Sequence, residues 1–230
     1  MSLLIGLGYL AENGKDTVAA QILEHRSDKY KIKRIAFADP LKVEMFHALV
    51  NRADPFWTFM EKFNGTFFDD FRIPKPINPF ISDPQEKIDW INANKVALRY
   101  LLQVYGTEYR RKLDPFYWVR ALGNAANADP SDVVLIPDLR FINEAFFIKA
   151  NKGYTVNVIR EGFDSGVTGH VSEQELSKYV FDFQIKVQDG NLDELLSDAL
   201  ECFDTIIGLV TPDPVVESQE FTEEAFSAAA

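Results

Sequence analysis

The stretch from residue 3 to residue 20 constrains the fold of this 230-residue chain more than any other part of it. A short apolar run at 3–7 predicts a buried strand, and apolar residues at helical spacing begin at Val18. Between them lies a loop that ends in Gly14-Lys15. Strand, loop, Gly-Lys and helix in this order are typical of a phosphate-binding P-loop, in which backbone N–H groups and the lysine ammonium point at an anion.

The match to the standard P-loop pattern is partial. Tyr9 stands where the first glycine is usual, with Gly8 before it, and Asp16 follows the lysine, with Thr17 one residue later. An ordinary helix N-terminus with a surface lysine is the alternative interpretation. The setting between a strand and a helix favours a nucleotide site.

Composition limits the partners of this chain. An apolar fraction of 47% can bury a full core, as one domain or as one with an insertion. The net charge of −11 gives no basic surface of the kind that binds a nucleic-acid polymer. Residues 211–230 contain acidic side chains but no lysine or arginine, and we expect a solvated, disordered tail there, with a partner-binding tail as the alternative.

The cellular compartment is predicted from what the sequence lacks. Its one cysteine, Cys202, lies in an apolar helical pattern and cannot form an internal disulfide, which fits a reducing compartment. No apolar run approaches the ~20 residues of a membrane span. No basic region precedes the first apolar run, as it would in a signal peptide. We therefore expect a soluble, cytoplasmic protein with no membrane partner.

Strand and helix patterns alternate along the chain. Apolar runs at 3–7, 31–38, 132–138, 154–159 and 181–187 predict strands, with helical patterns between them. This alternation predicts a three-layer α/β fold with a parallel sheet of about five strands, in one domain spanning 1–210. Residues 53–84 break the pattern with many aromatic residues and prolines, so we expect a helical, aromatic-rich insertion at about 53–130. Most of its rings should pack rather than touch a ligand.

Polar residues follow two of the predicted strands, where ligands bind in open α/β sheets. Asp39-Pro40 follows the strand at 31–38: Asp39 is expected either to cap the next helix or to meet a ligand, and Lys42 lies near that helix's start. Asp138 follows the strand at 132–138, with Arg140 two residues later. At such a position an acidic residue orders the magnesium shell or orients the acceptor.

Two further segments carry candidate ligand contacts. In the helical pattern at 95–112, Arg99 and Gln103 are four residues apart on one face, and arginine suits bidentate recognition of phosphate; a solvated helix face is the alternative. The glycine-punctuated segment at about 161–172 is expected to form a mobile loop, which ends in a capping box of Ser172 and Glu175. Within this segment, His170 is expected to contact either a phosphate or the loop backbone.

Taken together, these segments resemble the bacteriophage-type deoxynucleoside monophosphate kinases, a branch of the P-loop nucleotide kinases. The residues that carry the resemblance are Gly14-Lys15-Asp16-Thr17, Phe37-Ala38-Asp39-Pro40-Leu41-Lys42, Leu101-Leu102-Gln103, Gly106-Thr107-Glu108, Arg111, Trp118, the run from Asp138 to Ala145, and His170 with Ser172-Glu173. The family also has aspartate after Gly-Lys, so Asp16 is a match, whereas Tyr9 stands where the family usually has glycine.

The resemblance implies magnesium-dependent phosphoryl transfer from ATP to a deoxynucleoside 5′-monophosphate, with small-molecule nucleotides as partners. It assigns the triphosphate to Asn13, Gly14, Lys15, Asp16 and Thr17, and Mg²⁺ to Asp16 or Thr17. It assigns the monophosphate substrate to Asp39, Lys42, Arg99, Gln103, Thr107, Arg111 and His170. Asp138 and Arg140 would lie between the phosphates, and Arg160 would close over them together with the segment at about 161–172, which would form a lid. These three residues would be catalytic, as would Lys15.

The same resemblance makes a homodimer reasonable and, if the chain is phage-encoded, implies the host cytoplasm. Two alternatives stay open. One is another P-loop small-molecule kinase, and the other is a catalytically silent nucleotide-binding scaffold.

Overall fold

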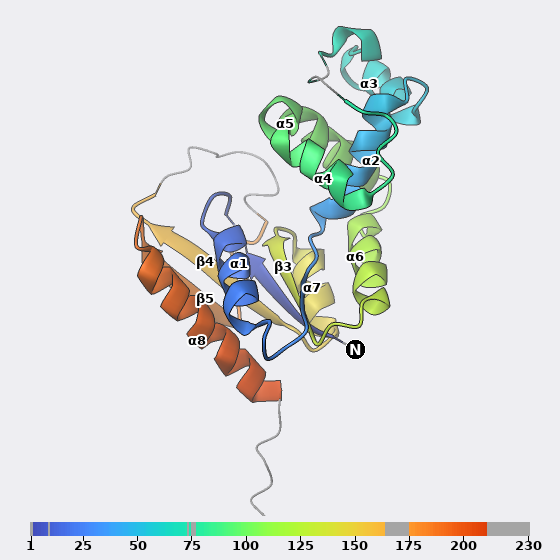
Figure 1. Cartoon of the computed structure of the whole chain (residues 1–230). Coiled ribbons are helices and arrows are strands. Elements are labelled where there is room, and N and C mark those ends of the chain that lie inside the picture. The colour runs from blue at the N-terminus through green and yellow to red at the C-terminus, as the bar shows by residue number, and fades with distance from the viewer. Residues whose placement is uncertain (1, 9, 73, 75–76, 164–174, 211–230) are drawn as a thin grey trace, which may run out of the picture.

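The computed structural model describes residues 2–8, 10–72, 74, 77–163 and 175–210. Its centre is a sheet of β1 (Leu3–Gly8), β2 (Ile32–Arg34), β3 (Val133–Leu139), β4 (Tyr154–Glu161) and β5 (Phe183–Gln188). The strand order is β2-β3-β1-β4-β5, and every neighbouring pair is parallel (Figure 1). The α/β fold with a five-stranded parallel sheet is therefore confirmed.

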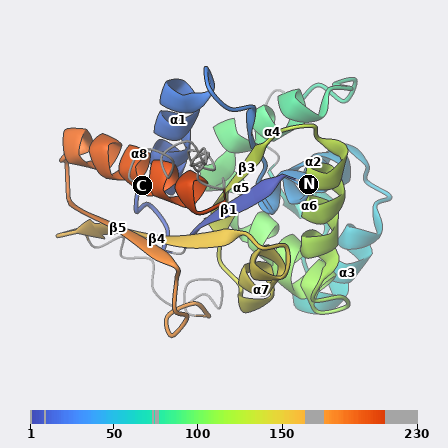
Figure 2. The same ribbon diagram turned by 90° about the horizontal axis from the view of Figure 1, so that it is seen from below.

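Helices cover both faces of this sheet, and its central strands, β1 and β3, are accordingly apolar and buried on both faces. On β1, Ile5 and Leu7 pack into a cluster with α1 (Lys15–Arg26) and α8 (Leu192–Val210). Leu4 points the other way, into a cluster with α6 (Tyr117–Ala128) and α7 (Ile142–Ala150). Figure 2 shows α1 and α8 on one side of the sheet and α7 on the other.

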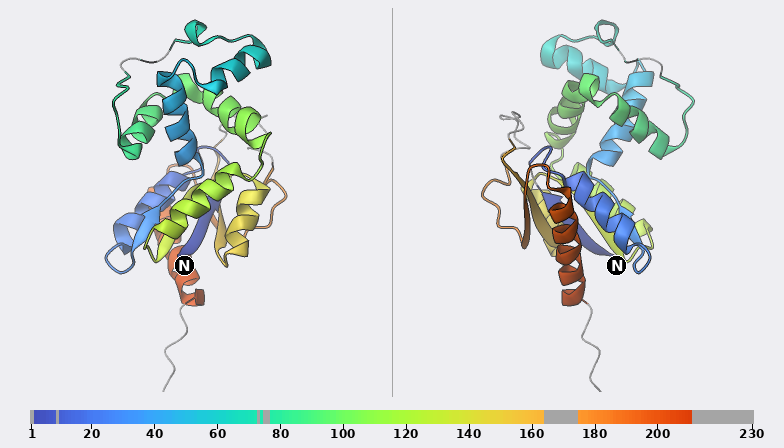
Figure 3. Two further views of the ribbon diagram at one scale, coloured as in Figure 1. Left: turned by 90° about the vertical axis from the view of Figure 1, so that its right-hand side faces the viewer. Right: turned by 60° about the vertical axis from the view of Figure 1, so that its left-hand side comes forward.

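A second group of helices lies beyond one end of the sheet (Figure 3), and we call it the helical cap. It contains α2 (Ala38–Val50), α3 (Pro55–Asn64), η1 (Phe68–Asp70), α4 (Pro84–Ala93), α5 (Lys95–Gln103) and the π-helix η2 (Val104–Arg111). The cap has its own buried cluster, in which the Phe56 ring lies 4.8 Å from that of Tyr105. Packing inside the cap therefore explains most of the aromatic residues of 53–84, whereas Phe63, Phe67 and Phe80 are exposed.

Two local predictions are wrong around β2. The strand has three residues instead of the eight predicted at 31–38, because the carboxylate of Asp138 accepts the N–H groups of Phe37 (2.9 Å) and Ala38 (2.8 Å) and the chain turns into α2. Asp39 is not the N-cap of α2, which begins at Ala38. The Asp39 carboxylate instead accepts the backbone N–H of Ala36 at 2.9 Å.

The predictions for Tyr9, for His170, for the Ser172 capping box and for most of the segment at 161–172 concern residues outside those described, as does the prediction for the tail at 211–230. Of the helices that are described, none is both long enough and apolar enough to cross a membrane.

Candidate active site

A cavity of about 370 Å³ lies between the sheet and the helical cap. One side, which we call the loop wall, is lined by Ala11, Glu12, Lys15 and Asp16. The opposite side, the cap wall, is lined by Asn92, Lys95, Arg99, Gln103, Gly106, Thr107 and Arg111. Pro137, Asp138 and Arg140, at the end of β3, lie between the two walls. The cavity therefore lies at the carboxyl ends of the parallel strands, where α/β sheets bind their ligands.

The lining of this cavity is positively charged, in contrast to the chain as a whole. Seven lysines and arginines line it, against four acidic residues. The basic residues are Lys15, Arg34, Lys42, Lys95, Arg99, Arg111 and Arg140, and the acidic ones are Glu12, Asp16, Asp138 and Glu144. The full sequence has 24 basic and 35 acidic residues. Such a local excess of cations in an acidic protein attracts a polyanionic ligand.

The loop wall is held in a fixed conformation. Gly14 has φ +87°, a left-handed conformation that residues with a Cβ rarely adopt, and α1 begins directly after it at Lys15. Lys15 is only 6% exposed, and its ammonium donates to the carbonyl of Leu10 across the loop. The lysine thus lies at the helix N-terminus, with its charge among the loop's backbone groups.

Asn13 joins the loop to the sheet. Its side-chain oxygen accepts the backbone N–H of Arg160, at the end of β4, at 2.8 Å, and its amide donates to the carbonyl of Ala11 at 2.9 Å. The Arg160 guanidinium donates to Asp189 at 2.5 Å and lies over the Phe163 ring, with Cζ 4.0 Å from the ring centroid. Neither Asn13 nor Arg160 lines the cavity, so both act on it through the loop.

The carboxylate of Asp138 lies at the start of α2. Burial raises its pKa above the ordinary value, whereas the N–H bonds from Phe37 and Ala38 oppose the shift. Nearby, Asp39 lies 3.5 Å from a nitrogen of Arg34 and 3.4 Å from the Lys42 ammonium. Asp39 therefore holds two cations that line the cavity without lining it itself.

The cap wall carries three predicted residues on successive helical turns, Arg99, Gln103 and Thr107. The fourth, Arg111, ends η2, and its guanidinium pairs with the carboxylate of Glu144 on α7. The pair is buried, with side chains 11% and 2% exposed.

Nine predicted site residues line the same cavity: Lys15, Asp16, Lys42, Arg99, Gln103, Thr107, Arg111, Asp138 and Arg140. Asn13, Gly14, Thr17, Asp39 and Arg160 are described but do not line it, and Thr17 is exposed. Most of the predicted site residues, though not all of them, therefore lie around one cavity.

No role was predicted for several lining residues. Lys95 lies one helical turn before Arg99 on α5, so helical spacing could have identified it, whereas Asn92 belongs to the preceding helix, α4. No local pattern identifies Arg34, and Glu144 lies in the run that carries the resemblance without a predicted role, because their places in the lining depend on how distant segments pack. The aromatic residues of the lining are Phe37, Trp118 and Phe141, and none of the described rings of 53–84 is among them.

Magnesium was also predicted at this site. Asp16 is exposed, in the first turn of α1, and lines the cavity beside Lys15, so its carboxylate fits a cation that is shared with phosphate oxygens. No cluster of three or more His, Cys, Asp or Glu side chains that could hold a metal exists within the described part of the chain.

Comparison with known proteins gives two curated relatives. Over 184 residues, 65% of this chain and 72% of the relative, the sequence is 28% identical to the deoxynucleoside-5′-monophosphate kinase of Escherichia phage T5. Over 76 residues, 33% of this chain and 39% of the relative, it is 37% identical to a putative deoxynucleotide monophosphate kinase of Acanthamoeba polyphaga mimivirus. The resemblance to deoxynucleoside monophosphate kinases is confirmed. No protein-family model matches the chain.

Solved structures give weaker likenesses. Dephospho-CoA kinase from Campylobacter jejuni matches with a TM-score of 0.40 and 15% identity, covering 90% of this chain and 98% of its own. A sugar kinase from Janibacter sp. HTCC2649 matches with a TM-score of 0.36 and 12% identity, covering 92% and 100%. The strand order and the positions of the helices define the fold of this chain.

Proposed function

We propose that this chain transfers the γ-phosphoryl group of ATP to deoxynucleoside 5′-monophosphates, giving the diphosphates and ADP. The observation that carries the proposal is the cavity at the carboxyl ends of the strands, with cationic side chains on both of its facing walls. Phosphoryl transfer needs positioning and charge neutralisation of phosphates more than it needs a covalent nucleophile. The similarity to curated deoxynucleoside monophosphate kinases supports this choice of substrate.

The loop wall would take the triphosphate. The amides of 13–17 and the Lys15 ammonium would bind its oxygens, with Asp16 or Thr17 as the protein's contribution to a magnesium site. The ion would neutralise phosphate charge during transfer. Since Asp16 lines the cavity and Thr17 does not, we favour Asp16.

The cap wall would take the monophosphate. Arg99 and Arg111 would bind its phosphate, since guanidinium groups recognise phosphate oxygens in a bidentate way, and the Lys42 ammonium on α2 would add a third positive charge. Gln103 and Thr107 would face the sugar or base. Asp138 and Arg140 would lie between the two phosphates, and Asp39, Arg160 and His170 would support the site from outside the described cavity lining.

The test is ADP release from ATP and Mg²⁺ with each deoxynucleoside and ribonucleoside monophosphate offered in turn. We expect turnover with one or more deoxynucleotides. Turnover only with another phosphorylated metabolite would identify a different small-molecule kinase. Tight ATP binding without transfer to any acceptor would identify a scaffold and overturn the proposal.

A further inference from the structure

Glu144 is a buried acid that the proposed reaction does not use. It lies on α7, in the run that resembles the kinases, and is 1% exposed. One carboxylate oxygen pairs with the guanidinium of Arg111, and the other accepts the backbone N–H groups of Arg140 (2.9 Å) and Phe141 (3.1 Å). It therefore connects the end of the cap wall to the backbone that follows β3.

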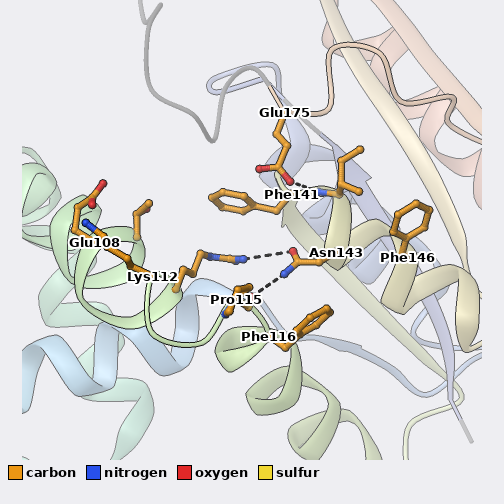
Figure 4. Close-up of a pocket in the computed structure, with 11 residues that line it drawn as sticks. Glu108, Lys112, Pro115, Phe116, Phe141, Asn143, Phe146 and Glu175 are labelled. Atoms are coloured by element: carbon orange, nitrogen blue, oxygen red, sulfur yellow. Dashed lines mark hydrogen bonds between the residues drawn. The ribbon is translucent and has the colours of Figure 1, made fainter.

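The neighbours of Glu144 surround the same guanidinium. The Arg111 Cζ atom lies 3.8 Å from the centroid of the Phe141 ring, and a terminal nitrogen lies 3.4 Å from the Asn143 side-chain oxygen. Asn143 is itself fixed, because its amide donates to the carbonyl of Pro115 at 2.6 Å (Figure 4). The first turn of α7 and the residue before it thus form a socket for one arginine side chain.

This socket leaves Arg111 able to bind a ligand. A guanidinium carries five N–H donors, and the bonds to Glu144 and Asn143 require two of them. Arg111 lines the main cavity and also a neighbouring one of about 770 Å³, shown in Figure 4. The side chain is therefore held at the wall between two solvent-accessible spaces.

We propose that Glu144 is a positioning residue for phosphoryl transfer: it fixes the Arg111 guanidinium against Phe141, so that the arginine meets the acceptor phosphate in one orientation. The inference rests on the proposed function, because it assigns Arg111 to the acceptor. A fixed guanidinium loses less conformational entropy when it binds phosphate than a mobile one does. Glu144 should therefore affect the KM for the monophosphate more than the KM for ATP.

The charge state of Glu144 gives the proposal a second readout. Burial raises the pKa of Glu144 to about 7, since desolvation and the nearby Asp138 outweigh the opposing effect of Arg111. In the described part of the chain, these two side chains are the charged groups of other elements that act on it, from η2 and β3. As the pH falls through 7, the carboxylate becomes neutral and its attraction for Arg111 weakens. The KM for the monophosphate should rise.

The experiment measures initial rates at pH 8 for the wild type, Glu144→Gln and Glu144→Asp. We expect Glu144→Gln to raise the KM for the monophosphate about tenfold, as for a lost charged hydrogen bond, with little change in the KM for ATP. Glu144→Asp, which keeps the charge, should lie between. Glu175→Gln is the matched control, because the Glu175 carboxylate also accepts a backbone N–H of α7, that of Ile142 at 2.9 Å. It should leave both constants unchanged.

The pH profile separates positioning from folding. Between pH 8 and 6 the monophosphate itself gains a proton, with a pKa of about 6. This protonation affects the KM of Arg111→Ala as well, although that variant lacks the guanidinium. Between pH 8 and 6, the KM of the wild type for the monophosphate should rise by a larger factor than that of Arg111→Ala or Glu144→Gln. If Glu144→Gln does not fold, the comparison of the wild type with Arg111→Ala still decides.

If Glu144→Gln has the same KM for the monophosphate and the same pH profile as an active wild type, the positioning role of Glu144 is overturned while the proposed function stands. The same holds for a wild-type pH profile that matches that of Arg111→Ala. A wild type with no turnover on any monophosphate would instead refute the proposed function.

Discussion

The two walls of the cavity are built in different ways. The loop wall is one continuous stretch between β1 and α1, fixed by backbone conformation at Gly14 and by the Asn13 bonds to Ala11 and Arg160. The cap wall consists of side chains on α4, α5 and η2, and its orientation depends on ion pairs to other helices. The proposed donor site is therefore formed by one contiguous stretch that a long-range bond from Arg160 ties to the sheet, whereas the proposed acceptor site depends on packing between several helices.

The largest effect should come from the loop wall. Replacing Lys15 by Ala removes the buried ammonium at the start of α1. We expect kcat to fall about 10²- to 10³-fold, as it does when a preorganised charged donor is lost from a site of phosphate chemistry. Steady-state ADP release measures it. A variant that keeps its full kcat would show that the loop wall does not hold the transferred phosphate.

A substitution in the cap wall should weaken binding of the monophosphate and leave the loop wall intact. For Arg111→Ala we expect the KM for the monophosphate to rise about 10- to 100-fold, the range for a hydrogen bond to a charged group. The KM for ATP should change little. Equal changes in both constants would mean that the two walls do not bind separate nucleotides.

A third prediction concerns the anchor of the cap wall. The Glu44 carboxylate accepts hydrogen bonds from the hydroxyls of Tyr105 (3.0 Å) and Tyr117 (2.6 Å), and it pairs with Arg110 at 2.6 Å. Glu44→Gln should lower the free energy of unfolding by about 1–3 kcal/mol, because the half-buried Arg110 loses its anionic partner. Chemical denaturation measures this change. An unchanged stability would show that η2 is held by its apolar contacts alone.

The smallest effect should distinguish loop geometry from general strain. Gly14 and Gly65 both have positive φ, +87° and +74°, and a Cβ would fit in the available space at either position. Each Gly→Ala change should therefore cost about 1–2 kcal/mol of stability. Only Gly14→Ala should also raise the KM for ATP, since Gly65 lies in the cap, at the end of α3. Identical ATP kinetics in the two variants would contradict a role for the Gly14 conformation.

The same contrast explains what the sequence could predict. The parallel sheet and Lys15 follow from apolar periodicity and a contiguous motif, both of which are local. Arg99 and Gln103 were identified because they share a helix face, and both line the cavity; Arg99 is exposed, so the alternative of a solvated face stays open for it. The N-cap alternative for Asp39 was wrong because Asp138, about 100 residues away, accepts the N–H groups of Phe37 and Ala38 and α2 starts earlier. Glu144 lies in the run that carries the resemblance, but no role was predicted for it because its role depends on Arg111, which lies 33 residues earlier in the sequence.

The most direct test of the account uses a bisubstrate ligand, in which adenosine and the best deoxynucleoside acceptor are joined by five phosphates. The account predicts that it binds far more tightly than ATP or the monophosphate, because both walls of one cavity hold it at once. Calorimetry should show that Lys15→Ala and Arg111→Ala each abolish this gain. If the ligand binds no more tightly than ATP and Arg111→Ala leaves its affinity unchanged, the two walls do not form one phosphoryl-transfer site.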